Sequence, residues 1–160
     1  MTIARGDALP DARLTVMGDN GPRPIGAREL MGSGKTVLFA VPGAFTPTCS
    51  VEHLPGYLGH AAEIRDKGVD RIVCTAVNDI FVLHAWATAS GVGDRVIMAA
   101  DGNSEFARAL GLEMDGSGFG MGQRSKRYAL IIADGVVTEA LIEAPGEFRV
   151  SSAENVLKHL

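Results

Sequence analysis

Apolar and polar residues alternate along the chain in blocks that predict alternating strands and helices. Three runs rich in apolar and β-branched residues predict strands buried on both faces: Thr36 to Val41, Arg71 to Val77 and Arg95 to Ala99. Between them, apolar residues spaced by three or four positions predict helices from Pro47 to Gly68 and from Asp79 to Ala89. This order of strands and helices is typical of an α/β domain.

Shorter patterns predict the remaining elements. They are a hairpin around Gly18 to Pro22, a helix from Ala27 to Met31, a helix capped by Asn103 or Ser104 and ending at Leu110, a hairpin of strands Arg127 to Ala133 and Val136 to Ile142 turned by Asp134–Gly135, and a helix near Ser152 to Leu160. Right-handed crossovers would place helices on both faces of a mixed central β-sheet. Because no repeat or linker divides the chain, residues 1–160 are expected to form a single domain.

Composition and charge exclude several classes of function. The chain is 46% hydrophobic and 21% charged, as expected of an ordinary globular protein. Its net charge of -4 offers no basic surface for nucleic acid or for an anionic membrane. No apolar run approaches the roughly 20 residues that a membrane span needs, and no targeting pattern is evident. We therefore expect a cytoplasmic protein whose partner is a small molecule or another protein.

The two cysteines are too few for a disulfide framework, and no CxxC, CxxH or HxxxH spacing suggests a metal site or a cofactor. Cys49 follows PGAFTPT in the first turn of a predicted helix, where free backbone N–H groups and the macrodipole stabilise an anion. Thr46 can point a hydroxyl at the sulfur, and Pro42 and Pro47 stiffen the loop. These features predict that Cys49 is a presented and activated thiolate.

The segment VPGAFTPTCSVEHLPGY resembles the active-site signature of the peroxiredoxins, in which Pro, three residues, Thr, two residues and Cys follow one another. VNDIFVLHAW and RSKRYAL resemble later motifs of the type II, or atypical two-cysteine, branch in order and spacing. The resemblance runs from about Gly6 to Leu160. It implies a thioredoxin-like fold, a homodimer formed near the active site, and a peroxidase that reduces hydrogen peroxide or alkyl hydroperoxides through a cysteine sulfenic acid.

Matching positions imply roles for individual residues. Cys49 would be the peroxidatic cysteine, Thr46 would hydrogen-bond the peroxide oxygens, and Pro42 would shield the sulfur. Arg127 would lie beside the thiolate, where a guanidinium favours the anion and stabilises charge on the leaving oxygen. By residue type alone Arg127 also fits a solvated strand edge. His53, four residues after Cys49, either touches the thiolate or packs the helix.

The thiol that reduces the sulfenic acid is left open by the sequence. Many animal members of the branch have a resolving cysteine near the C-terminus, where this chain has Val150. Cys74 matches the resolving position of plant members, but RIVCTAV is also a buried-strand pattern, and a disulfide needs Cα atoms within about 7 Å. The alternative is an external thiol, either glutathione with glutaredoxin or thioredoxin.

Two other functions are compatible with a lone reactive cysteine. A thiol–disulfide exchange protein usually needs a CxxC pair, which is absent here. A redox-sensing module would form sulfenic acid slowly and without turnover. The glycine-rich segment Gly116 to Gly122 lacks dinucleotide-binding spacing and is expected to be a mobile loop at the mouth of the pocket.

Overall fold

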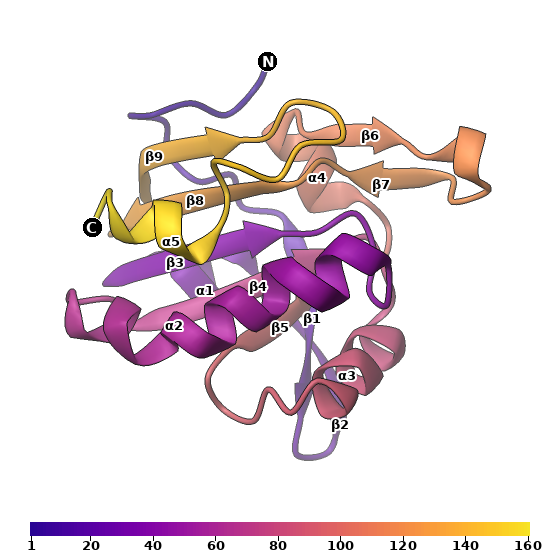
Figure 1. Cartoon of the computed structure of the whole chain (residues 1–160), viewed down its shortest axis with the longest axis horizontal. Helices are drawn as coiled ribbons and strands as arrows, with labels where there is room; N and C mark the ends of the chain where they lie inside the picture. Colours follow the sequence, from indigo (N-terminus) through magenta and orange to yellow (C-terminus); the bar gives the residue numbers. More distant parts are fainter.

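The computed structural model describes all of residues 1–160, with a central seven-stranded mixed sheet in the order β2-β1-β5-β4-β3-β8-β9 (Figure 1). The strands of this sheet are β1 (Arg13–Gly18), β2 (Gly21–Gly26), β3 (Lys35–Ala40), β4 (Arg71–Ala76), β5 (Ile97–Ala100), β8 (Tyr128–Ala133) and β9 (Val136–Ile142). The mixed α/β architecture predicted from the sequence is confirmed.

The three apolar runs form the three parallel strands at the centre of the sheet. β3 pairs in parallel with β4, which pairs in parallel with β5, while β8 lies antiparallel on the other side of β3. Every residue of β3 after Lys35 is buried, as is every residue of β4 after Arg71. Burial on both faces explains why these strands have continuous rather than alternating apolar sequences.

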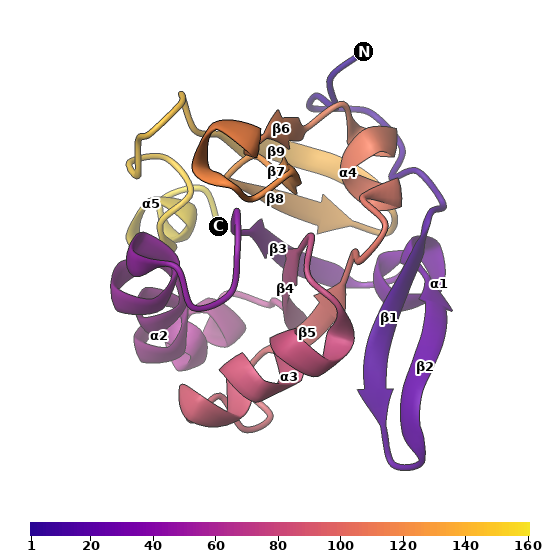
Figure 2. The ribbon, with the colours of Figure 1, turned by 90° about the vertical axis from the view of Figure 1, so that its right-hand side faces the viewer.

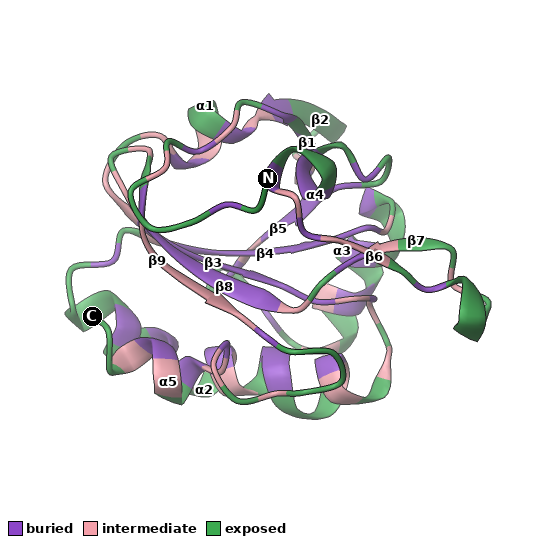
Figure 3. Ribbon diagram, turned by 90° about the horizontal axis from the view of Figure 1, so that it is seen from above, coloured by how far each residue is buried: buried purple, intermediate pink, exposed green.

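Helices cover both faces of the sheet, as the crossovers predicted (Figure 3). On one face, α2 (Leu54–Asp66), α3 (Ile80–Ala89) and α5 (Ala153–Leu157) contribute to one apolar core. On the other, α1 (Ala27–Met31) and α4 (Glu105–Leu110) pack with the N-terminal segment in a second core. None of the helices combines the length and the apolar character that a membrane crossing requires.

Both predicted hairpins are present. β1 and β2 pair antiparallel and project as a two-stranded ribbon (Figure 2). β8 and β9 are joined by Asp134 and Gly135, whose φ angles of 49° and 82° are both left-handed. Two consecutive left-handed residues match the twist of the flanking strands, which is why Asp-Gly is a strong hairpin signal.

One local prediction was wrong, and two short strands were missed. Ser104 occupies the N-cap position of α4 but makes no capping hydrogen bond; Asp101 at the end of β5 instead accepts from the backbone N–H groups of Phe106 and Ala107 at 2.9 and 2.8 Å. The glycine-rich segment is a loop, as predicted, and it contains a 3₁₀ turn (Ser117–Phe119); the two paired strands that it joins, β6 (Glu113–Asp115) and β7 (Gln123–Ser125), were not predicted. Strands of three residues are too short to show a periodic pattern.

His60 on α2 contacts a carboxylate on its own helix and another on α5. Its Nδ1 lies 2.9 Å from Oε1 of Glu63 on the same helix, and its Nε2 lies 3.2 Å from Oε1 of Glu154 on α5. Hydrogen bonding to Glu63 is the main reason that the pKa of His60 is raised above 6.5. The stability that these contacts provide is therefore fully present below pH 6.5 and is lost as the pH rises through the folded-state pKa.

The variant His60→Gln is expected to lose this pH-dependent contribution. The difference in free energy of unfolding between wild type and variant should be largest near pH 5.5 and should shrink toward about pH 8.5. Urea denaturation across this range measures it. His159→Gln is the control, because His159 contacts a backbone carbonyl and no carboxylate. A wild-type-minus-His60→Gln difference that stays constant with pH would contradict the prediction.

Candidate functional site

Cys49 lies where the chain leaves the central strand β3 and enters a helix. The helix begins at Pro47, and residues Cys49–His53 form a π-helical turn before α2 starts at Leu54. Phe45 in the preceding loop has a φ of 65°, a conformation that a bulky residue rarely adopts. Insertions of π geometry and strained backbone both concentrate at functional sites. The local backbone therefore marks this turn as a candidate active site.

A cavity of about 640 Å³ opens beside this turn. It is lined by Pro42, Thr48, Glu52, Met114, Asp115, Phe119, Lys126, Arg127, Glu143, Ala144, Pro145, Gly146, Glu147 and Phe148. Cys49 itself is 0% exposed, so the expectation of a presented thiol was wrong. The helical turn packs its side chain into the core of the α2 face. Arg127 connects the cavity with the sulfur, because its side chain lines the cavity and also contacts Cys49.

Arg127 lies directly before β8, the strand next to β3, and contacts the sulfur from there. Its Nη2 donates to Cys49 Sγ at 3.2 Å, and its Nη1 donates to His53 Nδ1 at 2.8 Å. A guanidinium stays charged and holds its donors in a rigid plane, so one side chain can grip both groups at once. This arrangement supplies the positive charge and the hydrogen bond that favour an anionic sulfur.

His53 is fully buried and binds Arg127 rather than the sulfur. Its ring packs against Phe39 and Phe148, with centroids 5.0 Å away in each case, and its Nε2 lies 3.1 Å from the carbonyl oxygen of Ser151. Burial, with the charge of Arg127, lowers the pKa of His53 to about 3. The ring is therefore neutral: Nε2–H donates to Ser151 and Nδ1 accepts from Arg127. His53 therefore does not match either alternative alone, because its ring packs in the core and also hydrogen-bonds the arginine that contacts Cys49.

Thr46 and its neighbours shape the loop before Cys49. The Thr46 hydroxyl donates to the carbonyl of Gly43 at 2.6 Å and makes no hydrogen bond with Cys49. Ala44 N–H donates to the side chain of Asn78 at 2.9 Å, which ties the loop to the end of the β4 region. With its proton engaged, the Thr46 oxygen keeps lone pairs that can accept a hydrogen bond from a ligand.

Cys74 lies in the middle of β4 and is 0% exposed. Both cysteines are free and belong to the same apolar core. Burial, with the nearby Cys49, raises the pKa of the Cys74 thiol well above its usual range. Cys74 is therefore a neutral thiol at physiological pH and a weak nucleophile.

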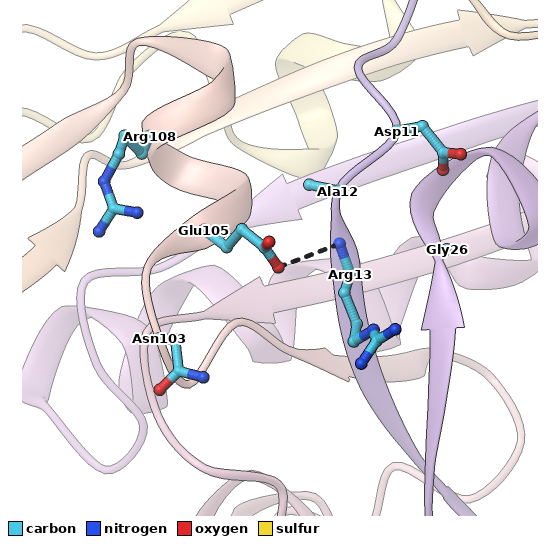
Figure 4. A pocket seen from close by; sticks show the side chains of 7 residues that line it. All are labelled: Asp11, Ala12, Arg13, Gly26, Asn103, Glu105 and Arg108. Atoms are coloured by element: carbon cyan, nitrogen blue, oxygen red, sulfur yellow. Dashed lines mark hydrogen bonds between the residues drawn. The ribbon is translucent and has the colours of Figure 1, made fainter.

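A second hollow, of about 620 Å³, lies between β1, β2 and α4 (Figure 4). It is lined by Asp11, Ala12, Arg13, Gly26, Asn103, Glu105 and Arg108, and Glu105 Oε2 accepts from the backbone N–H of Arg13 at 3.3 Å. The lining contains both acidic and basic side chains but no thiol and no imidazole. This hollow is not part of the cysteine site.

Comparison with known proteins agrees with the geometry. The sequence matches the Redoxin family over residues 4–157. It is 52% identical over 164 residues to Peroxiredoxin-2E-2, chloroplastic, from Oryza sativa subsp. japonica, covering 99% of this chain and 73% of that protein. It is 43% identical to Peroxiredoxin-2C from Arabidopsis thaliana, covering 99% and 98%. The chain belongs to the peroxiredoxin family.

The solved structures include reduced Prx3 from Vibrio vulnificus in complex with H2O2, which superposes on this peroxiredoxin with a TM-score of 0.95 at 50% identity, covering 99% of both chains. This chain is thus a type II peroxiredoxin with a thioredoxin-like fold. It is a thiol peroxidase that reduces peroxides through a peroxidatic cysteine.

Several residues of this peroxiredoxin's site were not found from the sequence. Glu143, just after β9, accepts hydrogen bonds from the backbone of Arg149 and from the backbone and hydroxyl of Ser151. Ser151 in turn accepts from His53 and Tyr57 through its carbonyl. The sequence EAPGEFRVSS carries no motif for such an arrangement, because carbonyl and carboxylate contacts across the fold have no local spacing.

Proposed function

We propose that Cys49 is the peroxidatic cysteine and that Arg127 holds its sulfur in the reactive anionic form. The observation that carries this proposal is the 3.2 Å contact between Arg127 Nη2 and Cys49 Sγ. Cys74 has no comparable cation contact and lies inside the sheet. Because the thiolate rather than the thiol is the nucleophile, the cysteine beside the guanidinium is the one suited to attack.

The proposed reaction starts with attack of the Cys49 thiolate on the terminal oxygen of a hydroperoxide, ROOH. An S–O bond forms, the O–O bond breaks, and the electron pair leaves with RO⁻, which takes a proton from solvent to give water or an alcohol. Sulfur is oxidised to sulfenic acid and the peroxide is reduced. Arg127 stabilises the negative charge that grows on the leaving oxygen.

Pro42 and Thr46 complete the proposed site. Pro42 lines the cavity at the end of the loop after β3 and would keep water from the sulfur. The free lone pairs of the Thr46 hydroxyl would accept the O–H of the incoming peroxide. Met114, Phe119 and Phe148 give the cavity an apolar part, which supports alkyl hydroperoxides as substrates beside hydrogen peroxide.

Stopped-flow mixing of the reduced protein with one equivalent of hydrogen peroxide tests the proposal. Trp86 is the only tryptophan and is buried, with its Nε1–H donating to Ser50 beside Cys49 at 3.0 Å, so its fluorescence reports on the site. Rapid loss of one equivalent of peroxide with a fluorescence change is the expected result. Slow loss would favour a redox sensor, and insulin reduction without peroxide loss would favour thiol–disulfide exchange.

We further infer that an external thiol, glutathione with glutaredoxin or thioredoxin, reduces the sulfenic acid. The thiol adds to the sulfenic sulfur with loss of water, and a second thiol cleaves the mixed disulfide. The raised pKa and complete burial of Cys74 argue against it as the resolving thiol.

Cys74→Ser is accordingly expected to keep peroxide turnover with glutathione and glutaredoxin within about threefold of wild type, since the thiol it removes is not an effective nucleophile. Coupled oxidation of NADPH through glutathione reductase measures this rate. Loss of turnover in a folded Cys74→Ser protein would instead assign the resolving role to Cys74.

The proposal includes a homodimer that works in a reducing compartment such as the cytoplasm. Each subunit would be a single domain, organised around the seven-stranded sheet whose edge strands are β2 and β9. Large apolar side chains stay exposed on segments around Cys49: Phe45 at 55%, Val51 at 73% and Phe81 at 65%. Burying such side chains against a second copy would remove them from water.

Phe81→Glu is expected to convert the dimer to a monomer in sedimentation velocity, whereas Val136→Glu, on edge strand β9, should not. A wild-type monomer would contradict this part of the proposal.

A further inference from the structure

We propose that His53 is a positioning residue for the peroxidase reaction, held in place by a buried hydrogen-bonded chain that starts at the carboxylate of Glu143. The chain runs from Glu143 to Ser151, from Ser151 to His53, from His53 to Arg127 and from Arg127 to Cys49. The inference rests on the proposed role of Arg127 and adds the reason why that side chain points at the sulfur.

The link between Arg127 and His53 decides where the guanidinium lies. Nη1 donates to His53 Nδ1 at 2.8 Å while Nη2 donates to Cys49 Sγ at 3.2 Å. Because the guanidinium is planar and rigid, fixing one Nη fixes the direction of the other. Only an imidazole that is neutral and protonated on Nε2 can accept at Nδ1. Without that acceptor, a long arginine side chain beside an open cavity of about 640 Å³ is free to turn into it.

The link between His53 and Ser151 selects this tautomer. The carbonyl oxygen of Ser151 lies 3.1 Å from His53 Nε2 and accepts from the Tyr57 hydroxyl at 2.7 Å. A carbonyl can only accept, so the nitrogen that faces it must carry the proton. The side chains of His53 and Tyr57 are fully buried, and the Tyr57 ring stacks on Phe39. Water does not compete for these bonds.

The link between Ser151 and Glu143 holds the carbonyl where it is. The Glu143 carboxylate accepts from Arg149 N–H at 2.9 and 2.8 Å, from Ser151 N–H at 2.8 Å and from the Ser151 hydroxyl at 2.7 Å. Burial opposes the charge of Glu143, but hydrogen bonds from Ser151 and Arg149 outweigh it and lower the pKa of Glu143. The carboxylate is thus ionised at neutral pH and binds the turn with charge-assisted hydrogen bonds.

Three substitutions of His53 separate positioning from packing. His53→Asn places an amide oxygen near the position of Nδ1 and retains an acceptor for Arg127. His53→Gln places an amide nitrogen near Nε2 and retains the donor to Ser151 but not the acceptor. His53→Phe retains the aromatic volume and neither hydrogen bond. If His53 only packs, His53→Phe is the mildest change; if it positions Arg127, His53→Asn is the mildest.

Two rates are measured for each folded variant: kcat/KM for hydrogen peroxide, and alkylation of Cys49 by iodoacetamide as a function of pH. We expect His53→Phe and His53→Gln to lose about 10-fold to 100-fold in kcat/KM, the effect of one hydrogen bond to a charged group, and their alkylation profiles to move to higher pH. His53→Asn should stay within about threefold of wild type even though its smaller side chain lowers the melting temperature more than phenylalanine does.

Glu143→Gln changes the first residue of the hydrogen-bonded series and leaves the His53 side chain intact. This test therefore does not depend on a folded His53→Asn protein. Placing an NH2 group against the N–H groups of Arg149 and Ser151 loosens the turn. We expect a loss of about fivefold in kcat/KM with native His53, and no further loss in the His53→Phe background, because contributions that act through one residue are not additive.

Activity that follows melting temperature across the His53 variants, or a Glu143→Gln loss that persists in His53→Phe, would overturn the inference. Measuring Arg127→Gln in parallel distinguishes failure of the proposed role of Arg127 from failure of the positioning role of His53. If Arg127→Gln retains the wild-type rate, the proposed role of Arg127 fails. If Arg127→Gln loses the rate while all three His53 variants keep it, only the positioning role of His53 fails.

Discussion

Replacing Cys49 by serine is expected to abolish peroxide consumption, lowering kcat/KM for hydrogen peroxide by at least about 10³-fold. A serine hydroxyl keeps the size of the side chain and can keep a hydrogen bond to Arg127. It does not ionise at neutral pH, so the nucleophile is lost while the site geometry is preserved. Competition assays or direct measurement of residual peroxide give the rate, and circular dichroism shows that the fold is retained.

Cys74→Ser is the matched control for this prediction. It makes the same change of side chain at a second fully buried cysteine of the same apolar core. The single-turnover rate of Cys74→Ser should equal that of wild type. A Cys49→Ser protein that still consumes one equivalent of peroxide, or a Cys74→Ser protein that consumes none, would move the peroxidatic role away from Cys49.

Replacing Arg127 by glutamine should have the second largest effect, a loss of about 10²-fold to 10³-fold in kcat/KM for hydrogen peroxide, which is typical of removing a preorganised donor to developing charge. Two consequences combine in this variant. The Cys49 sulfur loses the contact at 3.2 Å that favours its anion, and the leaving oxygen loses a fixed positive charge. Iodoacetamide alkylation reports the first effect separately from peroxide turnover.

Arg127→Lys and Lys126→Gln are the controls. A lysine keeps the charge, but a single ammonium cannot reproduce the planar grip on His53 and Cys49, so Arg127→Lys should recover only part of the loss. Lys126 lines the same cavity one residue away and has no contact with the sulfur. If Lys126→Gln costs as much as Arg127→Gln, general positive charge in the cavity would explain the activity, and the specific contact would not.

Most of the fold was predictable because its elements have local signals. The apolar runs that became β3, β4 and β5 need no knowledge of their neighbours, and Asp134–Gly135 specifies its turn through two left-handed residues. One prediction failed where a residue outside the expected cap position took over the capping. The N-terminus of α4 is capped by Asp101, directly after β5, rather than by Ser104 three residues later, and the usual N-cap spacing does not anticipate that choice.

The candidate site was likewise predictable only where its residues are close in sequence. Pro42, Thr46 and Cys49 lie within eight residues, so the sequence alone placed them on one strand-to-helix loop. The burial of the sulfur was not visible, because it depends on how tightly that turn packs into a core whose buried residues come from positions between Val37 and Val156. A turn-forming composition says where the backbone bends and does not say what covers it.

The sequence by itself determined the order of strands and helices, the position of Cys49 shortly after a buried strand, and the resemblance that suggested a peroxidase. Only the tertiary structure decided that Arg127 and Cys49, 78 residues apart, and His53 and Ser151, 98 residues apart, are in contact. The physical reason is the range of the signals. Periodicity and turn chemistry act between neighbours in the chain, whereas these contacts exist because β8 pairs with β3 and the segment after β9 returns over the start of α2.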